Sequence, residues 1–126
     1  MAITLLVVDD SAIMLNLVRQ ALEQDGYTLL TGKNGEEGVA LFREHPEIDL
    51  VITDINMPVM DGIELIGAIR ALNAGVPVFA LTSESDTLMR EKGRAAGANG
   101  WIVKPFQAGQ FRDIVRQVLE RFGVSG

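Results

Sequence analysis

The sequence predicts an α/β protein built on a five-stranded, doubly wound parallel sheet with five helices. Five short apolar runs alternate with five segments of helical periodicity, the pattern of successive βαβ units with right-handed crossovers. The apolar runs are nearly uninterrupted, as in strands that are buried on both faces. At 126 residues the chain has the size of one domain, so we expect residues 1–126 to form a single unit.

The first strand and helix have clear boundaries. Residues 3–8 form an apolar run that ends on Asp9 and Asp10, and Ser11 then offers a helix N-cap. The helix is expected to lay one apolar stripe on the sheet, at the spacing i, i+3, i+4, i+7 and i+8: Met14, Leu17, Val18, Ala21 and Leu22.

The next two strands differ in how they end. Residues 27–31 form a short strand whose following turn carries no acid or hydroxyl placed like the others, so we expect an edge strand away from any site. Residues 36–42 are expected to form a short helix. The apolar run at 50–53 then ends on Asp54, and a turn leads to a helix over residues 62–70.

The last third of the chain contains one weak and one strong helix. The strand at 76–81 ends at a hydroxyl, Thr82, and is followed by a helix over 85–96 that is rich in glycine and alanine. Few apolar side chains anchor this helix, which predicts mobility. The strand at 101–103 ends on Lys104. The final helix has the clearest stripe: Phe111, Ile114, Val115, Val118, Leu119 and Phe122.

The composition excludes several classes of function. A formal net charge of -6 disfavours direct binding to nucleic acid, and the absence of cysteine excludes disulfides, thiol nucleophiles and cysteine-ligated zinc. The single histidine, His45, lies before a strand and therefore opposite Asp54, where we expect an ordinary surface residue. No segment resembles a signal peptide or a membrane span, so we expect a cytoplasmic protein with no membrane partner.

Functional groups follow four of the five predicted strands: Asp9 and Asp10, Asp54, Thr82 and Lys104. The carboxyl ends of parallel strands lie side by side, and ligands of such sheets bind there. Three neighbouring carboxylates repel one another by about 4 kcal/mol per pair at 4 Å and an effective dielectric near 20. A cation must offset this repulsion. Oxygen ligands without histidine or cysteine favour a hard ion, Mg²⁺.

This set of groups suits covalent acceptance of a phosphoryl group. Asp54 is the expected nucleophile because it stands alone at a central strand, whereas Asp9 and Asp10 form a metal-binding pair. Lys104 and Mg²⁺ would neutralise the phosphoryl oxygens, and the Thr82 hydroxyl and the Ser83 backbone N–H would hydrogen-bond one of them. Helix capping or solvation explains each residue singly, but does not explain all of them at four strand exits.

Four stretches resemble the signatures of response regulator receiver domains, and the match extends over residues 3–122. Such domains are flavodoxin-like, with strand order 2-1-3-4-5. The stretches are Val7-Val8-Asp9-Asp10-Ser11, Thr53-Asp54-Ile55-Asn56-Met57-Pro58-Val59-Met60-Asp61-Gly62, Leu81-Thr82 and Val103-Lys104-Pro105-Phe106.

The resemblance implies a signalling protein of a two-component system rather than an enzyme with a separate substrate. It implies that Asp54 takes its phosphoryl group from a histidine kinase or phosphotransfer domain and that the protein promotes its own phosphorylation and dephosphorylation. It also implies that Asp10, Asp54 and the Asn56 backbone carbonyl bind Mg²⁺ with help from Asp9. The residues two places beyond Asp54 and Thr82, Asn56 and Glu84, are implied to tune the phosphoryl lifetime.

The resemblance further implies a switch in which Thr82 and Trp101 change rotamer and alter a face for a downstream target, formed by the fourth helix, fifth strand and fifth helix. It also implies a cis peptide at Lys104-Pro105. Two residues depart from the family pattern: Trp101 stands where tyrosine or phenylalanine is usual, and Gln107 replaces the usual cap of the last helix. The short tail after that helix is similar to the stand-alone chemotaxis type.

Three rival interpretations remain. A haloacid-dehalogenase-like phosphatase also forms an aspartyl phosphate with Mg²⁺, but its nucleophile lies in an Asp-x-Asp motif on the first strand, where this chain has Asp9-Asp10-Ser11. A nucleotide- or flavin-binding module would need a glycine-rich first turn instead of two acids. Finally, the receiver could be part of a longer regulator or hybrid kinase.

Overall fold

A computed structural model describes residues 2–57, 59–83, 87–104 and 106–124. Its five strands form one parallel sheet in the order β2-β1-β3-β4-β5, which confirms the predicted order. The strands are β1 (Thr4–Val8), β2 (Thr28–Gly32), β3 (Leu50–Asp54), β4 (Val78–Ser83) and β5 (Gly100–Lys104). The strand at 28–32 therefore lies at an edge, as expected.

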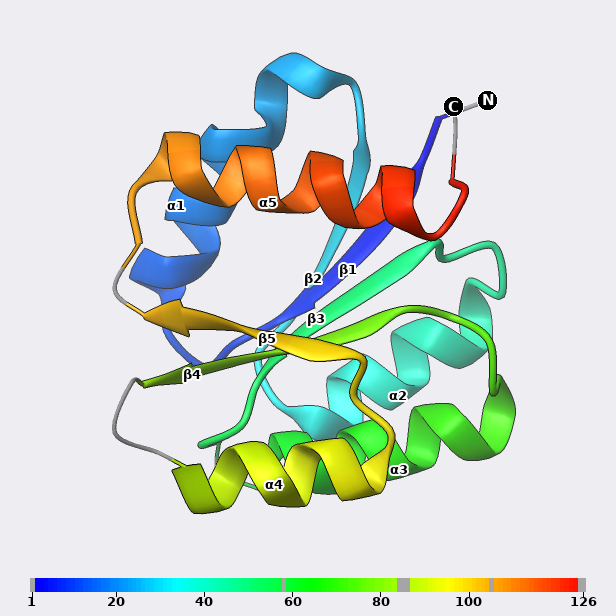
Figure 1. The fold of residues 1–126 in the computed structure, drawn as a ribbon. Helices are drawn as coiled ribbons and strands as arrows, with labels where there is room; N and C mark the ends of the chain where they lie inside the picture. The colour runs from blue at the N-terminus through cyan, green and yellow to red at the C-terminus, as the bar shows by residue number, and fades with distance from the viewer. Residues whose placement is uncertain (1, 58, 84–86, 105, 125–126) are drawn as a thin grey trace.

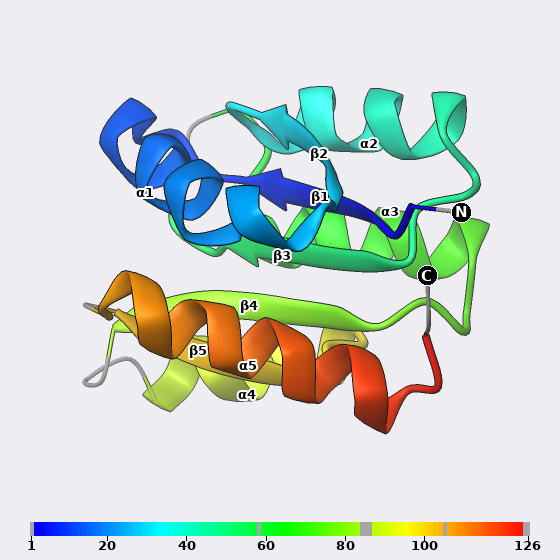
Figure 2. The same cartoon turned by 90° about the horizontal axis from the view of Figure 1, so that it is seen from above.

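The helices cover both faces of the sheet (Figures 1 and 2). They are α1 (Ala12–Leu22), α2 (Gly35–Glu44), α3 (Gly62–Leu72), α4 (Thr87–Ala96) and α5 (Ala108–Arg121), with a short 3₁₀ turn, η1 (Glu23–Asp25), after α1. In Figure 1, α1 and α5 lie above the sheet, and α2, α3 and α4 lie below it. None of the helices in the described part of the chain is long and apolar enough to cross a membrane.

The strands divide their side chains between two cores because successive residues point to opposite faces. On β1, Leu5 and Val7 pack with the residues of α1 and α5, whereas Leu6 and Val8 pack with those of α2 and α3. All four side chains are fully buried. This double burial explains why the residues of β1 between Thr4 and the strand exit are all apolar.

Several boundaries differ from the prediction. The helix expected at 36–42 begins at Gly35, because the Asn34 side chain accepts a hydrogen bond from the Glu37 N–H at 2.9 Å and caps the N-terminus. The same helix continues to Glu44. The last helix ends at Arg121, and Phe122 lies beyond it with its ring packed edge-on against Phe79. In α1, Leu15 is buried although the predicted stripe does not include it.

The prediction that few apolar side chains anchor the fourth helix, α4, is confirmed. Gly93 is the only buried residue of α4, and Leu88 on the same helix is 63% exposed. The expected start of this helix at Ser85 lies outside the described residues. The mobility of α4 remains a prediction.

Candidate functional site

The parallel register brings the predicted groups to one edge of the sheet. Val8 on β1 lies opposite Thr53 on β3, so Asp9 follows next to Asp54. On the other side, β4 and β5 are paired so that Ser83 lies opposite Lys104. The strand exits of β1, β3, β4 and β5 therefore line one site, as the sequence indicated.

Three carboxylates meet at this site. Asp9 is fully buried, Asp54 is 7% exposed and Asp10 is exposed. One carboxylate oxygen from each of the three lies within 4.8 Å of the others. The group is thus a compact cluster with two buried members and one that faces solvent.

Lys104 reaches into this cluster from the end of β5. Its Nζ donates a hydrogen bond to Asp9 Oδ2 at 3.1 Å and lies 3.3 Å from Asp54 Oδ2. Burial, and next the charge of Asp9, raise the pKa of Asp54 above its ordinary value despite the opposing effect of Lys104. Burial alone would lower the pKa of Lys104, but Asp54 and Asp9 together raise it, so the ammonium form is favoured.

The cluster has the chemistry of a site for a hard cation. Its ligand atoms are carboxylate oxygens, and the exposed Asp10 leaves room for the water molecules that Mg²⁺ retains. Burial is the main cause of the raised pKa of Asp54, and the charge of Asp9 adds to it, so a further cation beside Lys104 would stabilise the carboxylate form. The residues therefore fit Mg²⁺ in ligand type, in charge and in solvent access.

Local hydrogen bonds hold Asp9 in place. Its Oδ1 accepts a bond from the Ser11 backbone N–H at 2.9 Å, and its own N–H donates to the Gly32 carbonyl at 3.1 Å. Ser11 in turn caps α1, because its hydroxyl oxygen accepts from the Met14 N–H at 3.2 Å. The edge strand β2 thus supports the site through its backbone, although it supplies no functional side chain.

The loop after β3 holds Asp54 from the other side. The Asn56 backbone lowers the pKa of Asp54 and so favours its carboxylate form, although burial outweighs this effect, and the Asn56 side chain is exposed. A Cβ at Gly62 would overlap the Asp54 carbonyl oxygen, so only glycine fits at the start of α3. Val59 has φ 71°, an unfavourable conformation for a β-branched residue. The Asp-Gly pair signalled the turn, but no sequence signal predicted the strain at Val59.

The two proposed switch residues lie on neighbouring strands. Thr82 is 3% exposed, and its hydroxyl donates to the Ser83 carbonyl at 3.2 Å. Trp101 is half-buried and lines an open groove of about 520 Å³ together with Phe106 and Ile114. The guanidinium of Arg90 on α4 lies over the Trp101 ring, 5.7 Å from its centroid, a contact that sequence reasoning missed. Glu84 and Pro105 lie outside the described residues.

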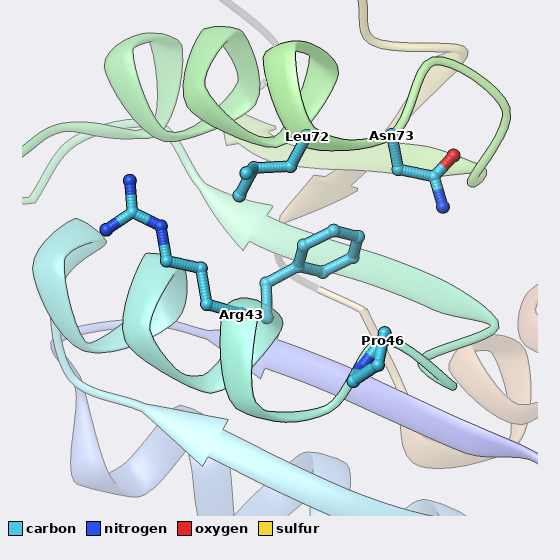
Figure 3. A pocket seen from close by; sticks show the side chains of 5 residues that line it. Arg43, Pro46, Leu72 and Asn73 are labelled. Carbon is cyan, nitrogen blue, oxygen red and sulfur yellow. The ribbon is translucent and has the colours of Figure 1, made fainter.

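A separate pocket of about 210 Å³ lies between the C-terminal ends of α2 and α3 (Figure 3). Its walls are Phe42, Arg43, Pro46, Leu72 and Asn73, which include no acid or hydroxyl. His45 lies nearby in sequence, with its Nδ1 3.2 Å from the Glu47 carboxylate, and it is a surface residue as predicted. Neither feature brings several carboxylates and a lysine together, as the strand exits do.

Comparison with known proteins agrees with this geometry. Residues 5–116 match the model of the response regulator receiver domain. The chain is 40% identical to the chemotaxis protein CheY of Halobacterium salinarum, over 94% of this chain and 98% of that protein. It is 32% identical to the probable transcriptional regulatory protein TcrX of Mycobacterium tuberculosis, where the match covers 98% of this chain but 52% of the relative.

Solved structures show the same architecture. The chemotaxis protein CheY4 of Vibrio cholerae superposes with a TM-score of 0.87 at 34% identity, covering 94% of this chain and 100% of that one. A complex from Borrelia burgdorferi, described as CheX-CheY-BeF3-Mg, gives a TM-score of 0.83 at 29% identity over 95% of this chain and 89% of that one.

Proposed function

The chain belongs to the response regulator receiver family, and on that premise we propose that Asp54 accepts a phosphoryl group from a histidine kinase or a phosphotransfer domain. One observation carries the proposal: Lys104 Nζ lies between the buried carboxylates of Asp9 and Asp54, within 3.3 Å of both. A lysine in this position can stabilise the negative charge that develops on a phosphoryl group bound at Asp54.

In the proposed reaction an Asp54 carboxylate oxygen attacks phosphorus, and the bond between phosphorus and the donor imidazole nitrogen breaks as the new O–P bond forms. The freed imidazole takes up a proton. The chain supplies position and charge: Asp9 and the Asn56 backbone hold their places beside Asp54, and Lys104 pairs with a phosphoryl oxygen. Attack of water on phosphorus later reverses the modification.

Asp10, Asp54 and the Asn56 backbone carbonyl would hold Mg²⁺, with Asp9 assisting. The ion would supply charge neutralisation for the oxygens in transfer. The compact set of carboxylate oxygens supports this assignment, as does the Mg in the description of the Borrelia burgdorferi complex. Asp10 is the best placed of the acids to bind a hydrated ion because it alone faces solvent.

The response to phosphorylation would pass through Thr82 and Trp101. The Thr82 hydroxyl and the Ser83 backbone N–H would hydrogen-bond the phosphoryl group, and the indole would move into the space that Thr82 vacates. The changed surface is the face of α4, β5 and α5, where a downstream target protein would bind. Asn56 and Glu84 would set the phosphoryl lifetime.

The relatives indicate two settings for this switch. The matches to chemotaxis proteins support a chemotaxis response regulator that acts in the cytoplasm without direct binding to nucleic acid or membrane. The matches to transcriptional regulators of about twice the length support the alternative of a receiver within a longer regulator. The chemistry proposed for residues 1–126 is the same in both settings.

Intact-mass measurement after incubation with acetyl phosphate and Mg²⁺ tests the proposal. Wild type should gain the mass of one phosphoryl group, and Asp54→Asn should not. Asp61→Asn is a matched control, since Asp61 caps α3 by accepting from the Glu64 N–H at 2.9 Å and asparagine caps equally well. An adduct on Asp54→Asn, or none on wild type at saturating donor, would contradict the proposal.

A further inference from the structure

We propose that Arg90 is a positioning residue for Trp101, whose guanidinium holds the indole in the arrangement seen here and opposes the rearrangement that follows phosphorylation. The inference rests on the proposed function of Asp54. It adds a residue that the four sequence signatures do not include and that belongs to a different element from either switch residue.

The contact has the geometry of a cation–π interaction. The Arg90 guanidinium carbon lies 5.7 Å from the centroid of the Trp101 ring, within the range in which a cation is attracted by the ring face, and tryptophan is the strongest partner. Both side chains are partly buried, which strengthens the attraction relative to water. The interaction therefore favours the indole position that allows it.

The same contact joins two elements that are otherwise weakly connected. Helix α4 packs chiefly on α3 and β4, and Gly93 is its only buried residue. Within α4 and β5, all of whose residues are described, Arg90 and Trp101 form the only charged or polar side-chain interaction between the two elements. A change in the indole would therefore be transmitted to α4 through this pair.

Arg90 also has an unfavourable feature. Its Nε is buried and has no hydrogen-bond partner among the described residues. A buried N–H without a hydrogen bond is destabilising, so the Arg90 position over the ring carries an uncompensated desolvation cost. Such an arrangement is easier to release than one in which every donor is satisfied, as a switch requires.

Space for a second indole position exists beside the ring. Trp101 lines the open groove of about 520 Å³ with Phe106, Gln110 and Ile114. Thr82 lies on the neighbouring strand and is almost fully buried, so its movement would also alter the space near the indole. The indole therefore has alternatives to the position beneath Arg90.

Substitution Arg90→Met tests the inference by removing the charge while keeping an apolar side chain of similar length. We expect the half-saturating concentration of beryllofluoride at fixed Mg²⁺, followed by ¹⁹F NMR, to fall about two- to fivefold, since a ligand binds more tightly when the competing arrangement is less stable. Loss of a positive charge alone would weaken binding of an anion, so tighter binding has the opposite sign to a general charge effect.

Trp101 is the only tryptophan, so its fluorescence gives a second readout. The emission and anisotropy of ligand-free Arg90→Met should shift toward those of wild type saturated with beryllofluoride, and Arg90→Lys should lie between. Arg121→Met is the matched control, because Arg121, at the end of α5, makes the same kind of contact with Phe122 at 5.9 Å. It should bind and fluoresce like wild type.

The outcomes separate the two proposals. If wild type binds beryllofluoride and Arg90→Met binds equally or more weakly, with unchanged emission, the role of Arg90 is overturned and the proposed function stands. An equal effect of Arg121→Met also overturns it. If wild type shows no Mg²⁺-dependent binding of beryllofluoride, the proposed function is overturned, and the role of Arg90 with it.

Discussion

Helices α4 and α5 flank the same strand, β5, but are attached to the sheet in different ways. Helix α5 buries Phe111, Val115, Val118 and Leu119, and Arg112 ties it to Asp25 through two hydrogen bonds of 2.9 Å. Helix α4 buries only Gly93. The face proposed for a downstream target therefore has one firmly packed side and one weakly packed side.

The difference assigns separate physical roles to the two helices. Burial of large apolar side chains makes α5 part of the core, so it contributes to global stability. Because α4 has little apolar burial, we expect it to be the element that a small free-energy change at the strand exits displaces. The charged site lies at the ends of β1, β3, β4 and β5, the edge of the sheet at which both α4 and α5 begin.

Phe111→Ala should give the largest loss in the free energy of unfolding. A small loss would contradict the conclusion that α5 is packed more firmly than α4. The ring is fully buried and stacks on Phe106 with centroids 4.7 Å apart, so we expect a loss of about 3 to 5 kcal/mol in urea unfolding. Leu88→Ala on α4 should change the free energy of unfolding by less than about 0.5 kcal/mol, because Leu88 is largely exposed. Equal losses would refute the division of roles.

Arg70→Met tests what holds the C-terminal end of α4. Arg70 donates to the Gly97 carbonyl at 2.9 Å, to Asn99 Oδ1 at 2.7 Å and to the Val76 carbonyl at 2.6 Å. Loss of these bonds should cost about 2 kcal/mol and should increase hydrogen exchange in α4 before α5. The exposed Arg94→Met is the control and should leave exchange unchanged. Uniform acceleration in both helices would argue against a local attachment.

Asp54→Asn should stabilise the protein in EDTA at neutral pH, by about 1 kcal/mol, because asparagine removes a buried negative charge that Asp9 repels. The pKa of Asp54 is raised in the folded state, so folding takes up protons and wild-type stability falls as pH rises through the raised pKa. Lys104 keeps Asp9 as a partner in the variant.

Thermal melts against pH measure this effect. The difference in stability between variant and wild type should disappear in acid, where the wild-type Asp54 carboxyl is protonated, and Mg²⁺ should stabilise wild type more than the variant. Asp61→Asn should melt like wild type. A variant that is less stable than wild type at neutral pH in EDTA would identify the Asp54 carboxylate as a structural group.

Gly93→Ala should give a small gain in stability and tests whether α4 is loosely packed against the rest of the protein. A Cβ at this position would lie 3.6 Å from Ile63 Cδ1 and 3.9 Å from Ile55 Cδ1, which are ordinary contacts. Alanine also has the higher helix propensity, so we expect a gain of about 0.5 to 1 kcal/mol in urea unfolding. The exposed Gly67→Ala on α3 is the comparison for propensity alone. A loss of stability would show that α4 packs too tightly for a methyl group.

The sheet and the acid cluster could be predicted from sequence because both depend on local patterns. Buried strands have apolar runs, and the side chains of Asp9, Asp54 and Lys104 follow such runs directly. The position of Phe122 was missed because its contact with Phe79 depends on tertiary structure. The cap of α2 is a local feature, since Asn34 accepts from the Glu37 N–H three residues further on.

The contacts of long polar side chains were the main features that the sequence did not predict. No sequence pattern predicts the Arg70 hydrogen bonds or the position of Arg90 over Trp101. Each of these contacts joins elements whose relative placement is determined only by the fold. The positive φ of Val59 likewise has no signal in the local sequence. The Arg70 hydrogen bonds lie at the residues before β4 and β5, at the edge of the sheet opposite the site, whereas Val59 lies in the loop that follows Asp54.

The central claim is that Asp54 forms the acyl phosphate, and borohydride reduction followed by peptide mapping tests it most directly. Borohydride converts an acyl phosphate to the alcohol and leaves free carboxylates intact, so the modified aspartate becomes homoserine. After treatment with acetyl phosphate and Mg²⁺, we predict homoserine at position 54 and none in a sample kept in EDTA. Homoserine at position 9 or 10 instead, or at no position in protein that carries the phosphoryl mass, would contradict the account.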